Sequence, residues 1–120
     1  MYKMSYNCTL EEIATKHATN CAYGHTTFEQ RLKTGENLYG RMPGIDDKTR
    51  LVDEASNGWF SELADYGVGQ QNIFTEELQK RPNTKIGHYV QMVWGDTISV
   101  GCAAQNCGNF SWVVCNYYPT

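Results

Sequence analysis

The apolar residues of this 120-residue chain change their spacing once, and this change constrains the fold more than any other feature. Before the Arg81-Pro82-Asn83 turn the spacing is mostly helical. After it, runs rich in Val, Tyr, Trp and Ile are separated by turns that contain glycine. Helices followed by strands are typical of an α+β fold, with helices packed on a mostly antiparallel sheet. The length and a hydrophobic fraction of 41% suit one domain, residues 1–120, with a single core.

The predicted helices occupy residues 9–20, 48–65 and 73–78. The first begins at Thr9-Leu10-Glu11-Glu12, which has the form of a capping box. The second ends near Gly67 and Gly69. Residues 24–44 are polar and rich in turn-forming residues, so they are interpreted as a connection. The predicted strands are residues 89–93, 99–104 and 111–118.

The charge and hydropathy of the chain argue against two kinds of partner. The formal net charge is −3 and the basic residues form no cluster, which argues against binding to nucleic acid. No apolar run approaches the roughly 18 residues that a membrane-spanning helix needs. We therefore expect no nucleic acid partner and no membrane span.

Five cysteines in so short a chain indicate a disulfide framework and an oxidising compartment. No Cys-x-x-Cys pair is present, so a zinc site built from thiolates is the weaker interpretation. The sequons at Asn7 and Asn109 are candidate glycosylation sites in a secreted protein. The first residues show no export signal, so we expect the chain to be a mature fragment, a chain with an added methionine, or the product of an incomplete gene model.

The three histidines differ in their surroundings along the sequence. His17 lies within the apolar stripe of the first predicted helix, where a packed, hydrogen-bonded side chain is expected. His25 and His88 each follow a glycine at the edge of a predicted element. Their positions alone favour surface or hydrogen-bonded side chains over metal ligands, because their spacing specifies no site as a helical i, i+4 pair would.

Five segments, in this order, resemble the CAP superfamily of cysteine-rich secretory, antigen 5 and pathogenesis-related proteins, also called the SCP-like domain. They are Cys21-Ala22-Tyr23-Gly24-His25, Gly35-Glu36-Asn37-Leu38-Tyr39, Trp59-Phe60-Ser61-Glu62-Leu63, the run from Gly87 to Trp94, and Val114-Cys115-Asn116-Tyr117-Tyr118-Pro119. The chain looks most like the nematode activation-associated secreted, or venom-allergen-like, proteins. The resemblance implies a three-layer α-β-α sandwich with a mostly antiparallel central sheet, stapled by disulfides.

The resemblance also implies a site and a disulfide pattern. In the family two histidines and two glutamates converge in a central cleft, and here these residues are His25, Glu36, Glu62 and His88. The histidines would hold zinc or another divalent cation. The implied disulfides are Cys21 with Cys107 and Cys102 with Cys115, which leaves Cys8 unpaired.

The function implied by the resemblance is that of a secreted, extracellular glycoprotein that binds host or other extracellular proteins and modulates immunity. One alternative is a metal-dependent hydrolase with Glu36 or Glu62 as the base, although no Gly-x-Ser-x-Gly or His-Glu-x-x-His motif is present and no catalytic residue is assigned. Another alternative is a sterol or fatty-acid binding protein. The family's first helix and its last residues are missing from this sequence. We therefore expect a domain truncated at both ends that associates through exposed apolar surface, as in a dimer.

Overall fold

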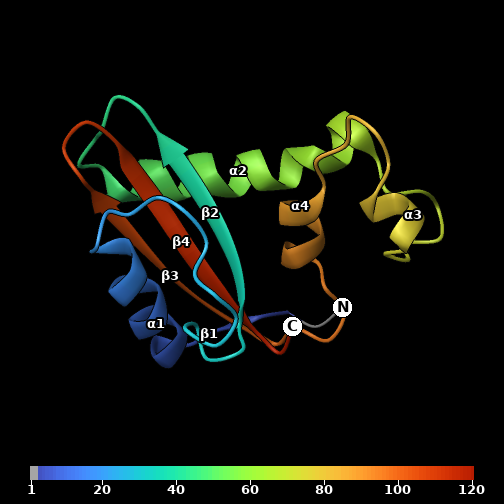
Figure 1. Cartoon of the computed structure of the whole chain (residues 1–120), viewed down its shortest axis with the longest axis horizontal. Helices are drawn as coiled ribbons and strands as arrows, with labels where there is room; N and C mark the ends of the chain where they lie inside the picture. The colour runs from blue at the N-terminus through green and yellow to red at the C-terminus, as the bar shows by residue number, and fades with distance from the viewer. Residues whose placement is uncertain (1–2) are drawn as a thin grey trace.

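The computed structural model describes residues 3–120, which form four helices and a four-stranded sheet (Figure 1). The elements in chain order are β1 (Ser5–Tyr6), α1 (Cys8–Ala18), β2 (Gly35–Arg41), α2 (Lys48–Tyr66), α3 (Glu76–Gln79), α4 (Gly87–Met92), β3 (Ser99–Asn106) and β4 (Ser111–Tyr118). The strand order is β1-β3-β4-β2. β4 pairs antiparallel with both β2 and β3, and only the two-residue β1 runs parallel to its neighbour. The sheet is therefore mostly antiparallel, as predicted.

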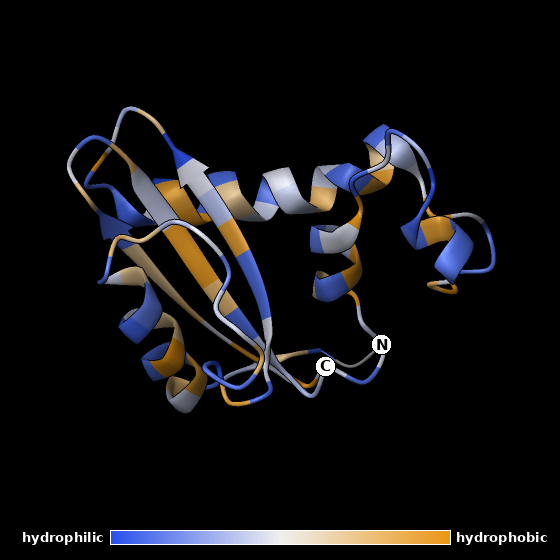
Figure 2. Ribbon diagram, viewed as in Figure 1, coloured by the Kyte–Doolittle hydropathy of each residue, from blue (hydrophilic) through white to orange (hydrophobic). Residues whose placement is uncertain are grey.

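The two long helices cover opposite faces of this sheet and give the expected α-β-α layers (Figure 1). Successive residues of a strand point to opposite faces, so a strand that is buried on both faces is apolar along most of its length. In β4, Val113 and Cys115 pack against α2, whereas Trp112 and Val114 pack against α1. The core is thus two apolar clusters, one on each side of the sheet, and β4 contributes to both. Its central part is strongly hydrophobic in Figure 2.

The long helices lie close to where the apolar spacing predicted them. α2 covers residues 48–66 against a prediction of 48–65, and it ends at Gly67, whose φ of 71° suits a residue without a side chain. The capping box predicted at Thr9 is wrong. Asn7 caps α1 instead, because its side-chain oxygen accepts hydrogen bonds from the backbone N–H groups of Thr9 and Leu10 at 2.8 and 3.1 Å.

Two predictions of local structure are wrong, and both concern segments at the site described below. Residues 89–93 do not form a strand but belong largely to α4, where the N–H of Val90 bonds to the carbonyl of Ile86 at 2.9 Å. A short apolar run cannot be assigned by periodicity alone, and this one packs against α2 rather than entering the sheet. The interpretation of residues 24–44 as a connection missed β2. Residues 73–78 are helical only at their end, in α3.

The disulfide pattern implied by the resemblance is present. Cys21 is bonded to Cys107 and Cys102 to Cys115, while Cys8 is free and exposed. The first bond ties the end of α1 to the β3–β4 turn, and the second joins directly opposed residues of β3 and β4. Among residues 3–120, none of the helices combines the length and the apolar character that crossing a bilayer requires.

Candidate functional site

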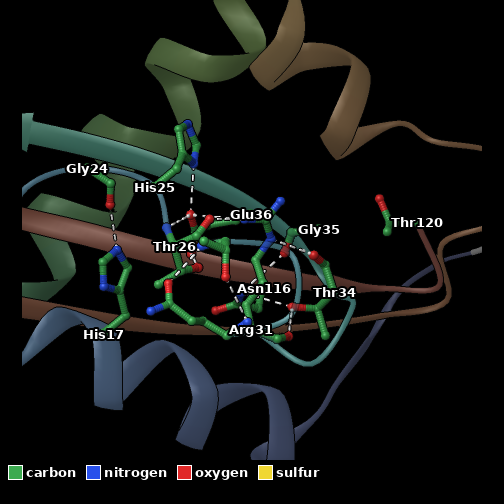
Figure 3. Close-up of polar contacts among 12 residues, drawn as sticks. His17, Gly24, His25, Thr26, Arg31, Thr34, Gly35, Glu36, Asn116 and Thr120 are labelled. Atoms are coloured by element: carbon green, nitrogen blue, oxygen red, sulfur yellow. Dashed lines mark hydrogen bonds and ion pairs between the residues drawn. The ribbon is translucent and has the colours of Figure 1, made fainter.

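His25 is held by a buried glutamate on the edge strand β2. Its Nδ1 donates to Oε1 of Glu36 at 2.8 Å, and Thr26 donates to the same carboxylate from its backbone N–H at 3.1 Å and from its hydroxyl at 2.7 Å (Figure 3). The guanidinium of Arg31 lies 3.9 Å away from Oε1. The Glu36 side chain is 1% exposed, so its negative charge is balanced by these donors rather than by water. Glu36 thereby fixes both the ring of His25 and the start of the loop after it.

The backbone before His25 is held from the other side by α1. Nε2 of His17 donates to the carbonyl oxygen of Gly24 at 2.6 Å (Figure 3). The His17 ring also packs edge-on against Trp112 with centroids 4.9 Å apart. His17 is 8% exposed, so the expectation of a packed, hydrogen-bonded residue is confirmed. Helix α1 and strand β2 together therefore determine where His25 lies.

His88 is held in the same way by a glutamate on α2. Its Nδ1 donates to Oε2 of Glu62 at 2.8 Å, and the other oxygen of Glu62 accepts from the backbone N–H of Tyr89 at 2.9 Å. The ring of His88 stacks on Trp59 with centroids 6.0 Å apart. Because the carboxylate binds both the ring and the first turn of α4, the position of His88 depends on how α4 packs on α2.

Asn37 completes the frame of the site, and the sequence reasoning did not assign it a role. Its side-chain nitrogen donates to the backbone oxygen of His88 at 3.1 Å and lies 3.2 Å from the hydroxyl of Tyr117 on β4. Burial raises the pKa of Tyr117 to about 12, while the hydrogen bond with Asn37 lowers it by a smaller amount. Asn37 directly follows Glu36 in β2, and both side chains are buried. This position beside an expected cleft residue is the sequence signal that could have identified Asn37.

The four residues expected from the resemblance line one cleft of about 350 Å³. Lys85 and Gln91 also line the cleft; Gln91 lies on α4, and its side-chain oxygen accepts a hydrogen bond from the hydroxyl of Thr120. The imidazoles of His25 and His88 are 59% and 38% exposed, whereas the carboxylates behind them are 1% and 11% exposed. The cleft therefore presents ring nitrogens to solvent and keeps its acidic groups inside.

The groups of this cleft that could coordinate a divalent cation are the ring nitrogens of His25 and His88. A carboxylate only accepts hydrogen bonds, so Nδ1 of each ring is the donor. In the neutral imidazole Nε2 then keeps its lone pair, which is the arrangement of metal-binding histidines with carboxylate partners. Within residues 3–120, no group of three or more His, Cys, Asp or Glu side chains is arranged to hold a cation. The side chains of the cleft thus offer a cation two imidazole nitrogens, fewer protein ligands than the three or four of ordinary zinc sites.

Comparisons with known proteins agree with this fold. The family model of the cysteine-rich secretory protein family, CAP, matches residues 1–117, and the chain belongs to this family. The chain is 41% identical over 119 residues to the Ancylostoma secreted protein of Ancylostoma caninum, covering 99% of this chain and 28% of that protein. It thus spans much less than the full length of this relative.

Two solved structures are also close in fold. The crystal structure of Na-ASP-1 has a TM-score of 0.94 and 43% identity, covering 99% of this chain and 30% of that one. The crystal structure of NaASP2 with Zn²⁺ has a TM-score of 0.91 and 39% identity, covering 99% and 61%. The α+β architecture and the relation to nematode secreted proteins are therefore established.

Proposed function

We propose that this CAP domain is an extracellular binding protein whose cleft holds one divalent cation, zinc by ligand type, through Nε2 of His25 and Nε2 of His88. The observation that carries this proposal is the pairing of each ring, at Nδ1, with a carboxylate that is largely buried. Such partners fix the tautomer that leaves Nε2 free and raise its basicity. The relative NaASP2 was crystallised with Zn²⁺, which supports the choice of ion.

In this proposal, neighbouring side chains of the same chain orient the two histidine rings. Glu36 and Glu62 hold the two rings, and Trp59 stacks on one of them. A bound divalent cation would supply positive charge and open coordination positions that a polar group of a partner could fill. With only two imidazole ligands, we expect an affinity below that of zinc sites with three protein ligands.

Binding is favoured over hydrolysis by how the carboxylates are used. A general base must be free to accept a proton from water. Glu36 accepts three hydrogen bonds, and Glu62 uses both of its oxygens. Both side chains are therefore better suited to orienting the histidines than to activating water, and we assign no catalytic residue.

An extracellular location follows from the same proposal. Two disulfides suit an oxidising compartment, and relatives carry the words secreted and venom in their names. Asn109 is exposed in the β3–β4 turn, where a glycan could be attached without disturbing the sheet. Asn7 is a poorer acceptor because its side chain caps α1. We propose host or other extracellular proteins as partners, with immune modulation as the outcome.

The experiment that tests the cation site is a calorimetric zinc titration of the oxidised protein beside His25→Ala and His88→Ala. Folding of each variant is checked by circular dichroism. We expect one zinc per chain in the parent and loss of binding in both variants while they remain folded. A folded parent that binds no zinc, or zinc binding that survives both substitutions, would contradict the proposal.

A further inference from the structure

A second cavity, larger than the cleft, lies at the end of the molecule away from most of the sheet. It has a volume of about 650 Å³, opens to solvent, and is lined by residues of α3 and α4 and of the segments that follow α2 and α4. Figure 1 shows where these elements lie. Its lining contains the aromatic residues Phe74, Tyr89 and Trp94 and the aliphatic residues Val90 and Val93. Phe74 and Trp94 pack edge-on with centroids 6.1 Å apart. The size and the apolar lining are those of a small-molecule site.

One charged side chain lines this cavity, and it is Asp96. Asp96 is exposed, and within residues 3–120 it takes part in none of the ion pairs. The cation Arg81 is engaged elsewhere, since its guanidinium donates to the backbone oxygens of Tyr66 and Gly67 at 2.8 and 2.7 Å, and it does not line the cavity. The cavity therefore offers an apolar, aromatic surface together with a single negative charge.

We propose that this cavity binds an amphiphilic amine, with the apolar body against Phe74, Val90 and Val93 and the ammonium group beside Asp96. The carboxylate attracts a cation, and the face of Trp94 or Tyr89 adds a cation–π contribution. A fatty acid of the same shape would place its carboxylate next to Asp96, where like charges repel. A neutral sterol would gain nothing from Asp96. The charge of the lining thus selects among apolar ligands that the volume alone would admit.

This proposal is separate from the cation site in the cleft. The residues that line the two cavities differ throughout. The two linings meet along α4, where Tyr89 and Val90 line the second cavity and the flanking His88 and Gln91 line the cleft. Binding of an amine should therefore persist when His88 is replaced and when a chelator is present, so failure of one proposal does not decide the other.

The test compares three ligands that share a twelve-carbon chain, namely dodecylammonium, laurate and 1-dodecanol. Each is titrated below its micelle concentration into the oxidised protein, the Asp96→Asn variant and the control variant Asp53→Asn, which removes an exposed carboxylate on α2. Tryptophan fluorescence reports binding, because Trp94 lines the cavity whereas Trp59 and Trp112 are buried. Sedimentation in parallel measures the oligomeric state.

We expect dodecylammonium to bind about tenfold more tightly than laurate, from one partly exposed ion pair and one cation–π contact. Asp96→Asn should remove the part of this preference that comes from the ion pair, which is most of it, and leave the affinity for dodecanol unchanged, whereas Asp53→Asn should change neither. The preference should also shrink at high salt. Equal or tighter binding of laurate by the parent would overturn the assignment, as would a preference that survives Asp96→Asn at its full size. Absence of binding by all three ligands, with a dimer in sedimentation, would show that a second copy fills the cavity instead.

Discussion

Replacing Glu62 by glutamine tests the central relation of the cleft, in which a carboxylate fixes the proton of a histidine ring. Glu62 offers two acceptor oxygens to two donors, Nδ1 of His88 at 2.8 Å and the N–H of Tyr89 at 2.9 Å. Glutamine has almost the same shape but only one acceptor oxygen. One of the two donors must therefore face an NH₂ group in the Glu62→Gln variant.

The two ways of placing the glutamine have different consequences. If its oxygen keeps the N–H of Tyr89, its NH₂ group faces Nδ1 of His88, and the ring proton must move to Nε2, which then has no free lone pair for a cation. If the oxygen keeps Nδ1 instead, the N–H of Tyr89 is left without an acceptor, at a cost of about 1–3 kcal/mol of folding free energy. Loss of a carboxylate partner of this kind typically costs 10–100-fold in metal affinity, or about 1.4–2.7 kcal/mol.

We expect the first placement to dominate, because it keeps α4 attached to α2. Zinc calorimetry should then show affinity weakened by about 10–100-fold, and nitrogen NMR of the His88 ring should show the proton on Nε2. The NMR measurement needs no metal, so it tests the relation even if zinc binding is weak. Glu12→Gln, which changes an exposed glutamate on α1, is the matched control. The reasoning is refuted if Glu62→Gln keeps the parent's affinity and the proton stays on Nδ1.

Three further predictions concern stability. Tyr117 has a pKa of about 12 in the fold against 10.0 for an ordinary tyrosine, so its contribution is complete below pH 10 and is lost as the pH rises toward 12, by roughly 3 kcal/mol; Tyr117→Phe should lower this alkaline slope in urea unfolding. Removing the Cys21–Cys107 bond should cost about 4.5 kcal/mol, against about 3 for Cys102–Cys115, because the bonded residues are 86 and 13 positions apart; chemical unfolding of paired Cys→Ala variants measures both. Asn7→Ala should cost about 1 kcal/mol by thermal unfolding, and Asn7→Asp, which keeps an acceptor at the cap, should cost less.

The helices and strands that the sequence predicted well are those whose side chains meet a single apolar surface. In α2, Leu51, Ala55 and Trp59 recur at helical spacing because they face one side of the sheet. β4 was identifiable because nearly all of it is buried and rich in β-branched and aromatic residues. In such segments local spacing and tertiary burial carry the same information, so one can be inferred from the other.

The resemblance, rather than spacing, accounts for the correct grouping of the cleft residues. His25 and His88 are far apart in the chain, and they approach only because β2 pairs with β4 and α4 packs on α2. Neither long-range contact has a signature in local periodicity. The resemblance was also the only reason to expect Glu36 and Glu62 in the cleft, because an isolated glutamate in a polar segment is ordinarily exposed.

The spacing of apolar residues predicted the wrong structure for β2 and α4, the two segments that contribute most of the cleft. One cause explains both errors. β2 resembles a connection because Glu36 and Asn37 are polar, yet both are buried and hydrogen-bonded. α4 resembles a strand because its apolar residues are adjacent, yet its first turn is fixed by the Glu62 carboxylate rather than by an apolar stripe. Buried polar groups replace apolar contacts in both segments. Segments that form a functional site often break the usual alternation or helical spacing of apolar residues. The two misassigned segments are of this kind, and both lie at the cleft.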